Sequence, residues 1–201
     1  MPNLDFTNLL TTHCFHCLQV EFASNSVLLS RQNKIKNIAA MQLPEILTIS
    51  SLETILNNPI TLSNDDILKI NNNYNYLHSK LEGQTIYYGI NTGFGSLCNV
   101  SIGKEDLSQL QENLVVSHAC GFGDTVDIEI VKLMLILKIK NLSKGYSGVH
   151  LDTVNGLVHL YNNQIYPIVY EQGSLGASGD LAPLAHLALP LLGKGKISFI
   201  D

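Results

Sequence analysis

The stretch Gly173-Ser174-Leu175-Gly176-Ala177-Ser178-Gly179-Asp180 predicts a tight loop that runs directly into a helix. Its three glycines within seven residues allow positive φ angles and a close approach of the backbone to itself. Asp180 is a favourable N-cap residue, and apolar residues recur behind it at helical spacing: Leu181, Leu184, Leu187, Ala188 and Leu191. We therefore expect a glycine-rich loop at the start of a helix.

The centre of this loop, Ala177-Ser178-Gly179, consists of small residues only. Because glycine leaves its amide unhindered, the nitrogen of Gly179 can attack the carbonyl carbon of Ala177. Ring closure with loss of water, together with dehydration of Ser178, would leave an exocyclic methylidene group, which is an electrophile that no standard side chain provides. The alternative is an ordinary helix-entry turn capped by Asp180, and the tripeptide alone leaves both interpretations open.

Composition limits the classes of function. The chain has 201 residues, of which 45% are hydrophobic and 14% charged, which suits one globular domain, or one and part of a second. A formal net charge of -5 favours neither nucleic acid nor an anionic membrane as a partner. No basic segment precedes an apolar core at the start, and the apolar run Leu133–Leu137 is too short to span a bilayer. We expect a cytoplasmic protein.

Residues 1–46 lack a sustained hydrophobic period and predict an extension that is disordered or follows a start site assigned too early. His13, Cys14, His16 and Cys17 place four potential ligands within five residues, which is too crowded for a tetrahedral zinc site. We therefore expect no metal site. The spacing of the cysteines is not that of a secreted disulfide framework, so reduced thiols are expected.

Residues 47–201 predict a mainly α domain. Ser63 and Asp66 form a capping box before an amphipathic helix that ends near Gly83. The other predicted helices cover residues 51–56, 104–118, 126–142 and 151–162, and the helix over 126–142 is apolar on nearly all sides, which favours burial. Pro190 should kink the last helix. Short strands are expected at 85–88 and 196–201, and an extended segment at 166–170.

The glycine-rich loop Gly89–Gly95 is neither a Walker A motif nor a dinucleotide fingerprint, so it does not predict phosphate binding. Tyr88 at its entry could be carried over a substrate by the flexible backbone. His118 ends a helical face and precedes a second glycine-containing turn. The alternative role for His118 is a favourable interaction with the helix dipole.

Four segments in this order and spacing resemble the aromatic amino-acid ammonia-lyases, and most of all the histidine ammonia-lyases among them. They are residues 88–95 (YGINTGFG), 111–121 (QENLVVSHACG), 142–148 (LSKGYSG) and 173–186 (GSLGASGDLAPLAH). The resemblance covers residues 47–201. It implies the N-terminal helical domain of the aspartase/fumarase-like ammonia-lyase fold, with short strands and glycine-rich loops, truncated before the central helical bundle.

The resemblance also implies roles for individual residues. Ala177, Ser178 and Gly179 would cyclise by themselves into the 4-methylidene-imidazole-5-one group, so that no external cofactor is needed. Tyr88 would be the base that removes the β-proton of the substrate, which requires a site that lowers the ordinary tyrosine pKa of about 10. His118, paired with Ser117, would face the substrate side chain. Asn91, Asp180 and His186 are expected to support the structure.

The implied reaction is elimination of ammonia from L-histidine to give trans-urocanate, the first step of histidine degradation. Because some tyrosine lyases share the Ser-His pair, a tyrosine ammonia-lyase or related aminomutase stays open, as does an inactive fragment of such an enzyme. Family members form homotetramers in which several subunits build each active site. We therefore expect the chain to be inactive by itself.

Overall fold

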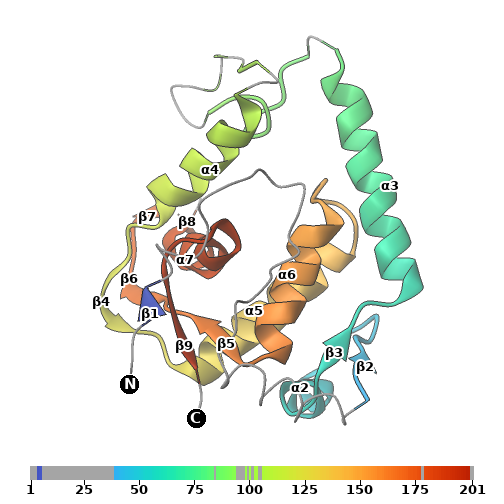
Figure 1. The fold of residues 1–201 in the computed structure, drawn as a ribbon, viewed down its shortest axis with the longest axis vertical. Coiled ribbons are helices and arrows are strands. Elements are labelled where there is room, and N and C mark those ends of the chain that lie inside the picture. The colour runs from blue at the N-terminus through green and yellow to red at the C-terminus, as the bar shows by residue number, and fades with distance from the viewer. Residues whose placement is uncertain are drawn as a thin grey trace.

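The computed structural model describes residues 4–5, 39–83, 85–93, 98, 100, 102–103, 106–177 and 179–199. These residues confirm a mainly α fold. The helices are α2 (Ile49–Leu56), α3 (Asn64–Leu81), α4 (Leu107–His118), α5 (Ile128–Ser143), α6 (Leu151–Asn162), α7 (Ala182–Ala188) and the 3-10 helix η3 (Leu189–Leu192). Figure 1 shows α3 and α4 on opposite sides of the molecule, with α5, α6 and α7 between them.

The hydrophobic core is centred on α5 and α6. Helix α5 buries Val131, Leu135, Ile136 and Ile139, and α6 packs Val154 and Leu157 against them, in agreement with the predicted burial of the apolar helix. Ile130 and Leu137 on α5 are nevertheless about half exposed, at 53% and 46%. The burial is therefore one-sided, although the sequence of α5 is apolar on nearly all sides.

The start of α3 confirms the predicted capping box. Ser63 Oγ accepts a hydrogen bond from the amide of Asp66 at 3.1 Å, and Asp66 Oδ2 accepts one from the amide of Ser63 at 3.0 Å. Two amides that have no partner within the helix are satisfied in this way. The buried Ile70 then anchors α3 in the core.

The strands are short and form four small sheets. Strand β9 (Lys196–Phe199) lies between β1 (Leu4–Asp5) and β5 (Ile165–Pro167), and both pairings are antiparallel. Strand β2 (Met41–Gln42) pairs parallel to β3 (Ile60–Thr61), whereas β4 (Phe122–Thr125) pairs antiparallel to β6 (Tyr170–Gln172). Strands β7 (Leu175–Gly176) and β8 (Gly179–Asp180) form a hairpin. The predicted strand at 196–201 is thus confirmed over residues 196–199, and residues 200 and 201 lie outside the described part of the chain. The predicted extended segment at 166–170 contributes to β5 and β6.

The prediction of a strand at residues 85–88 is wrong. Thr85–Tyr87 form no strand, and Tyr88 begins a turn. The side chain of Asn91 occupies the backbone groups that a ladder would use, because its Oδ1 accepts from the amide of Tyr87 at 2.7 Å and its Nδ2 donates to the carbonyl of Thr85 at 3.0 Å. Asn91 thus supports the loop, as expected.

The last helix also departs from a simple kink at Pro190. Helix α7 ends at Ala188, and the chain continues as the 3-10 helix η3, which contains Pro190. Gly193 closes this segment with a φ of +67°. The proline therefore changes the type of helix.

Part of the predicted extension packs on the domain. Residues 39–46 include β2, and Leu43 is buried in the core. The side chain of Asn162 at the end of α6 binds β3, the strand that pairs with β2. It accepts a hydrogen bond from the amide of Ile60 at 2.8 Å and donates one to the carbonyl of Ile60 at 2.9 Å. A domain boundary between residues 46 and 47 stays a prediction, and the His13–Cys17 cluster lies outside the described residues.

Replacement of Gly145 with alanine should destabilise the domain. Gly145 has a φ of +71°, and a Cβ there would lie 2.6 Å from the carbonyl oxygen of Lys69 on α3. We expect the free energy of unfolding in urea to fall by about 2 kcal/mol or more. Gly83→Ala is the matched control, since its Cβ would make ordinary contacts at 3.7 Å or more. Equal effects of the two substitutions would contradict this explanation.

Candidate functional site

The β7–β8 hairpin carries the first group of predicted site residues. Its register pairs Leu175 with Asp180 and Gly176 with Gly179, so that only Ala177 and Ser178 connect the strands. Ser178 itself lies outside the described residues. Gly179 has a φ of +89°, and no heavy atom lies within 4 Å of the position that a Cβ would take.

The described residues around Ser178 fit an internal ring closure. A two-residue connection keeps the amide of Gly179 near the carbonyl of Ala177, and the positive φ of Gly179 is a conformation that few other residues tolerate. Ala177 is exposed, and the space beside Gly179 is open. A ring formed here therefore meets no steric obstacle among the described residues.

Asp180 fixes the base of the hairpin. Its Oδ1 accepts hydrogen bonds from the amide of Ser174 at 3.1 Å and from the amide of Ala182 at 3.0 Å. The N-cap position of α7 is Leu181, one residue later than predicted, yet Asp180 still satisfies the first amide of the helix. A Cβ on Gly173 would lie within 2.4 Å of this carboxylate, which explains the glycine.

The second group lies in the loop at Tyr88, whose side chain is 62% exposed. Tyr88 begins a turn over residues 88–91, and Gly89 has a φ of +69°. Thr92 Oγ1 accepts from the amide of Gly89 at 3.2 Å, which fixes the turn from the inside. Phe94 and Gly95 lie outside the described residues.

Gln111 attaches this loop to α4. Its Nε2 donates to the carbonyl of Ile90 at 2.8 Å and lies 3.4 Å from the carbonyl of Gly89. The sequence analysis did not assign this role to Gln111. A signal was present, because Gln111 is a polar residue on a helical face that otherwise carries leucines.

His118 and Ser117 lie at the C-terminal end of α4. His118 Nδ1 is 2.6 Å from the carbonyl of Leu114, which requires a proton on Nδ1 for a hydrogen bond. Ser117 Oγ donates to the same carbonyl at 3.0 Å. The helix end therefore sets the orientation of the imidazole, and this contact agrees with the predicted alternative of a histidine that satisfies a helix terminus.

His186 joins the segment after His118 to α7. Its Nε2 accepts from the amide of Gly121 at 2.9 Å, and its ring meets the edge of Tyr170 at a centroid distance of 5.1 Å. His186 is buried, as expected, and a Cβ on Gly121 would come within 2.9 Å of its Nε2. Burial lowers the pKa of His186 and keeps the imidazole neutral. This hydrogen bond therefore connects the segment that follows His118 to α7.

Stability should fall as His186 is protonated. The pKa of His186 is lower in the folded state than in the unfolded chain, where it has the ordinary value of about 6.5. As the pH falls, the unfolded chain therefore binds the proton before the folded chain does. The urea midpoint should therefore decrease as the pH drops from about 7.5 to about 5.5. His186→Gln should reduce this decrease, and an unchanged decrease in this variant would contradict the explanation. His159, whose pKa burial also lowers, should contribute in the same direction.

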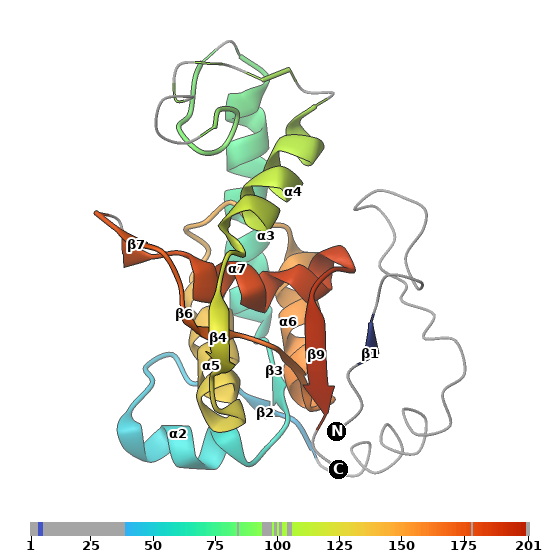
Figure 2. The ribbon, with the colours of Figure 1, turned by 90° about the vertical axis from the view of Figure 1, so that its left-hand side faces the viewer.

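The two groups of residues attach to different parts of α4. Gln111 in its first half binds the loop of Tyr88, and His118 ends the helix. Figures 1 and 2 show the β7–β8 hairpin nearer the C-terminal end of α4, whereas the segment that joins α3 to α4 lies beyond the opposite end. Within one chain, α4 thus separates the loop from the hairpin.

Comparison with known proteins identifies the family. The sequence profile described as aromatic amino acid lyase matches residues 47–200. The chain belongs to the aromatic amino acid lyase family. A histidine ammonia-lyase from Legionella pneumophila subsp. pneumophila is 45% identical over 156 residues, which cover 77% of this chain and 31% of that protein. The chain therefore spans less than a third of the length of this relative.

Solved structures of aromatic amino acid lyases and related enzymes share the fold. Histidine ammonia-lyase from Trypanosoma cruzi superimposes with a TM-score of 0.69 at 32% identity, covering 79% of this chain and 31% of that chain. Tyrosine aminomutase from Streptomyces globisporus gives a TM-score of 0.72 at 27% identity, with coverages of 79% and 30%. The expected N-terminal portion of the lyase fold is thereby confirmed.

Within the described ranges, no group of three or more His, Cys, Asp or Glu side chains could hold a metal ion. Across the same residues, no helix combines the length and the hydropathy needed to cross a bilayer.

Proposed function

We propose that this chain forms the N-terminal part of a histidine ammonia-lyase, which eliminates ammonia from L-histidine to give trans-urocanate as the first step of histidine degradation. The observation that carries the proposal is the 45% identity to the Legionella pneumophila histidine ammonia-lyase over 156 residues. The hairpin, the Tyr88 loop and the pair Ser117-His118 all lie within residues 47–200, which match the aromatic amino acid lyase profile. The substrate would be a small amino acid, with neither nucleic acid nor a membrane as partner.

Ala177, Ser178 and Gly179 would form the 4-methylidene-imidazole-5-one group without an external cofactor. This group supplies an electrophile that makes the substrate amino group a good leaving group. The fit of the described residues supports the assignment, since the hairpin leaves Gly179 unhindered and Asp180 holds its base. Because the hairpin is exposed, the group would be accessible to a substrate that another subunit helps to bind.

Tyr88 would remove the β-proton of the substrate. Tyr88 lies in an exposed loop that Gln111 attaches to α4. A movement of this loop would carry the phenol group with it. The buried Tyr166 could not serve instead, because burial raises its pKa to about 12. His118, oriented by the carbonyl of Leu114, would contact the imidazole of the substrate, with Ser117 beside it.

The separation of the loop and the hairpin within one chain supports a site shared between subunits. We infer that Tyr88 of one chain works with the Ala177–Gly179 hairpin of another, in a cytoplasmic homotetramer. Helix α4 holds the loop at its first half, while the hairpin lies nearer its other end. The chain by itself would then be inactive, because further catalytic residues come from the rest of the protein.

A chimera tests the proposed reaction. Residues 47–200 of this chain would replace the matching segment of the Legionella pneumophila relative, and L-histidine would be supplied. We expect urocanate absorbance with a kcat/KM within roughly 10²-fold of the parent enzyme, because small errors in positioning cost up to this factor. L-tyrosine should give no coumarate.

Two outcomes would argue against histidine as the substrate. The first is a chimera with native circular dichroism that forms coumarate from L-tyrosine, as a tyrosine-specific enzyme would. The second is a folded chimera that forms neither product while the parent enzyme is active in the same assay. Tyrosine specificity is the alternative worth testing, since a tyrosine aminomutase shares the fold.

A further inference from the structure

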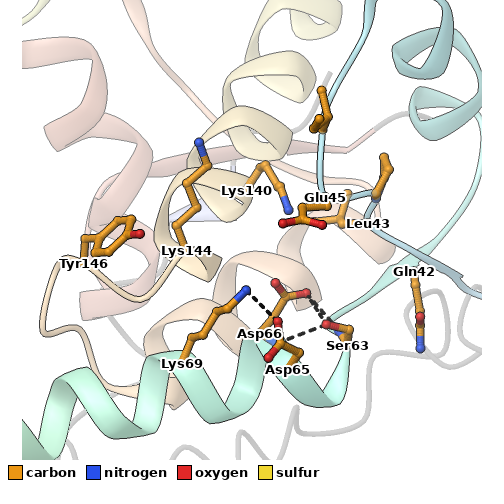
Figure 3. Close-up of a pocket in the computed structure, with 12 residues that line it drawn as sticks. Gln42, Leu43, Glu45, Ser63, Asp65, Asp66, Lys69, Lys140, Lys144 and Tyr146 are labelled. Carbon is orange, nitrogen blue, oxygen red and sulfur yellow. Dashed lines mark hydrogen bonds and ion pairs between the residues drawn. The ribbon is translucent and has the colours of Figure 1, made fainter.

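A pocket of about 760 Å³ lies on a part of the molecule that carries none of the proposed site residues (Figure 3). Its volume falls within the range of small-molecule sites. It is enclosed by residues 42–46, the N-terminal half of α3, the C-terminal end of α5, and Tyr146. The charged residues that line it are Glu45, Asp65, Asp66, Lys69, Lys140 and Lys144.

Half of these charges are satisfied within the pocket wall. Lys69 Nζ lies 2.5 Å from Asp65 Oδ2, and Asp66 accepts hydrogen bonds from the amide and the hydroxyl of Ser63. Within the described part of the chain, Glu45, Lys140 and Lys144 have neither an ion-pair partner nor a side-chain hydrogen bond. Two ammonium groups and one carboxylate therefore remain available.

Lys140 is the most informative of the three. Its side chain is only 7% exposed, and it lies on the buried face of α5 between Ile136 and Ser143. Figure 3 shows its nitrogen directed toward the Glu45 side of the pocket, although the two side chains form no ion pair within 4 Å. A buried ammonium group without an anionic partner is unfavourable. An anionic group of a ligand that reached Lys140 in the pocket would therefore be stabilising.

We propose that this pocket binds a free α-amino acid. Lys140, with Lys144 one turn further along α5, would bind the carboxylate of the ligand, and Glu45 would bind its ammonium group. This ligand pairs all three available charges, whereas an inorganic anion would leave Glu45 beside a like charge. The inference goes beyond the proposed reaction, and only the choice of L-histidine as the test ligand rests on that reaction.

Calorimetric titration of this chain tests the proposal. L-histidine would be compared with histamine, which lacks the carboxylate, with imidazolepropionate, which lacks the ammonium group, and with inorganic phosphate. We expect L-histidine to bind at least about tenfold more tightly than each of the three. Glu45→Gln should remove the preference for L-histidine over imidazolepropionate.

Lys140→Met should weaken L-histidine binding by about tenfold or more without lowering the stability of the chain, because it removes an unpaired buried charge. Lys138→Met, on the same helix but outside the pocket, is the matched control and should bind like the unaltered chain. The proposal is overturned if L-histidine does not bind, if the two variants bind it alike, or if phosphate binds as tightly. Because no turnover is measured, an inactive chimera would leave this result unaffected.

Discussion

Ser178→Ala should lower the formation of urocanate by the chimera by roughly 10⁴-fold or more, which is the scale on which turnover falls when a covalently acting residue is removed. Alanine has no hydroxyl group to eliminate, so the methylidene group cannot form at the hairpin. The intact mass gives a second measurement. The unsubstituted chimera should be lighter than its sequence by two waters, about 36 Da, and the variant should not show this loss.

Ser174→Ala is the matched control for this experiment. Ser174 lies at the base of the same hairpin, and only its backbone amide binds Asp180. This variant should keep both the mass loss and the activity. The proposed origin of the electrophile would be wrong if Ser178→Ala retained urocanate formation, or if the active chimera had the mass of its unmodified sequence.

Tyr88→Phe should lower kcat of the chimera by about 10²–10⁴, the contribution of a positioned general base. The substitution removes only the hydroxyl group, and the exposed ring keeps its place at the start of the turn. Tyr76→Phe is the control, because Tyr76 is similarly exposed, at 60% against 62% for Tyr88, but lies on α3. Comparable losses in both variants would show that the Tyr88 hydroxyl has no special role.

Mixing the two inactive variants tests whether subunits share the site. If Tyr88 works with the hairpin of another chain, refolding Tyr88→Phe together with Ser178→Ala should restore activity. Some sites in the mixture would then combine an intact tyrosine with an intact hairpin. No recovery is expected if both residues of each site come from one chain, and that result would contradict the shared site.

Local features of the fold followed from the sequence because they depend on residues a few positions apart. The capping box of Ser63 and Asp66, the bounds of α6 and the strand at 196–199 all formed as predicted. The strand expected at 85–88 did not form, because the side chain of Asn91 binds the backbone of Thr85 and Tyr87. Strand propensity alone does not include such competition from a nearby side chain.

Contacts between segments that are distant along the chain could not be predicted from the sequence. The attachment of the Tyr88 loop by Gln111 joins residues about 20 positions apart. The hydrogen bond from Gly121 to His186 spans 65 positions. The burial of Lys140 is a further example, since helical spacing marks a lysine as polar and cannot show that it faces a pocket.

The sequence by itself determined the small-residue loop before a helix, the order of the helices and the similarity to the aromatic amino acid lyases, because each depends on residue type and local spacing. Only the tertiary structure decided that the Tyr88 loop and the Ala177–Gly179 hairpin lie toward different ends of α4, and that Lys140 lines a pocket without an ion-pair partner among the described residues. The physical reason is that packing between helices, which has no fixed separation along the chain, sets these positions.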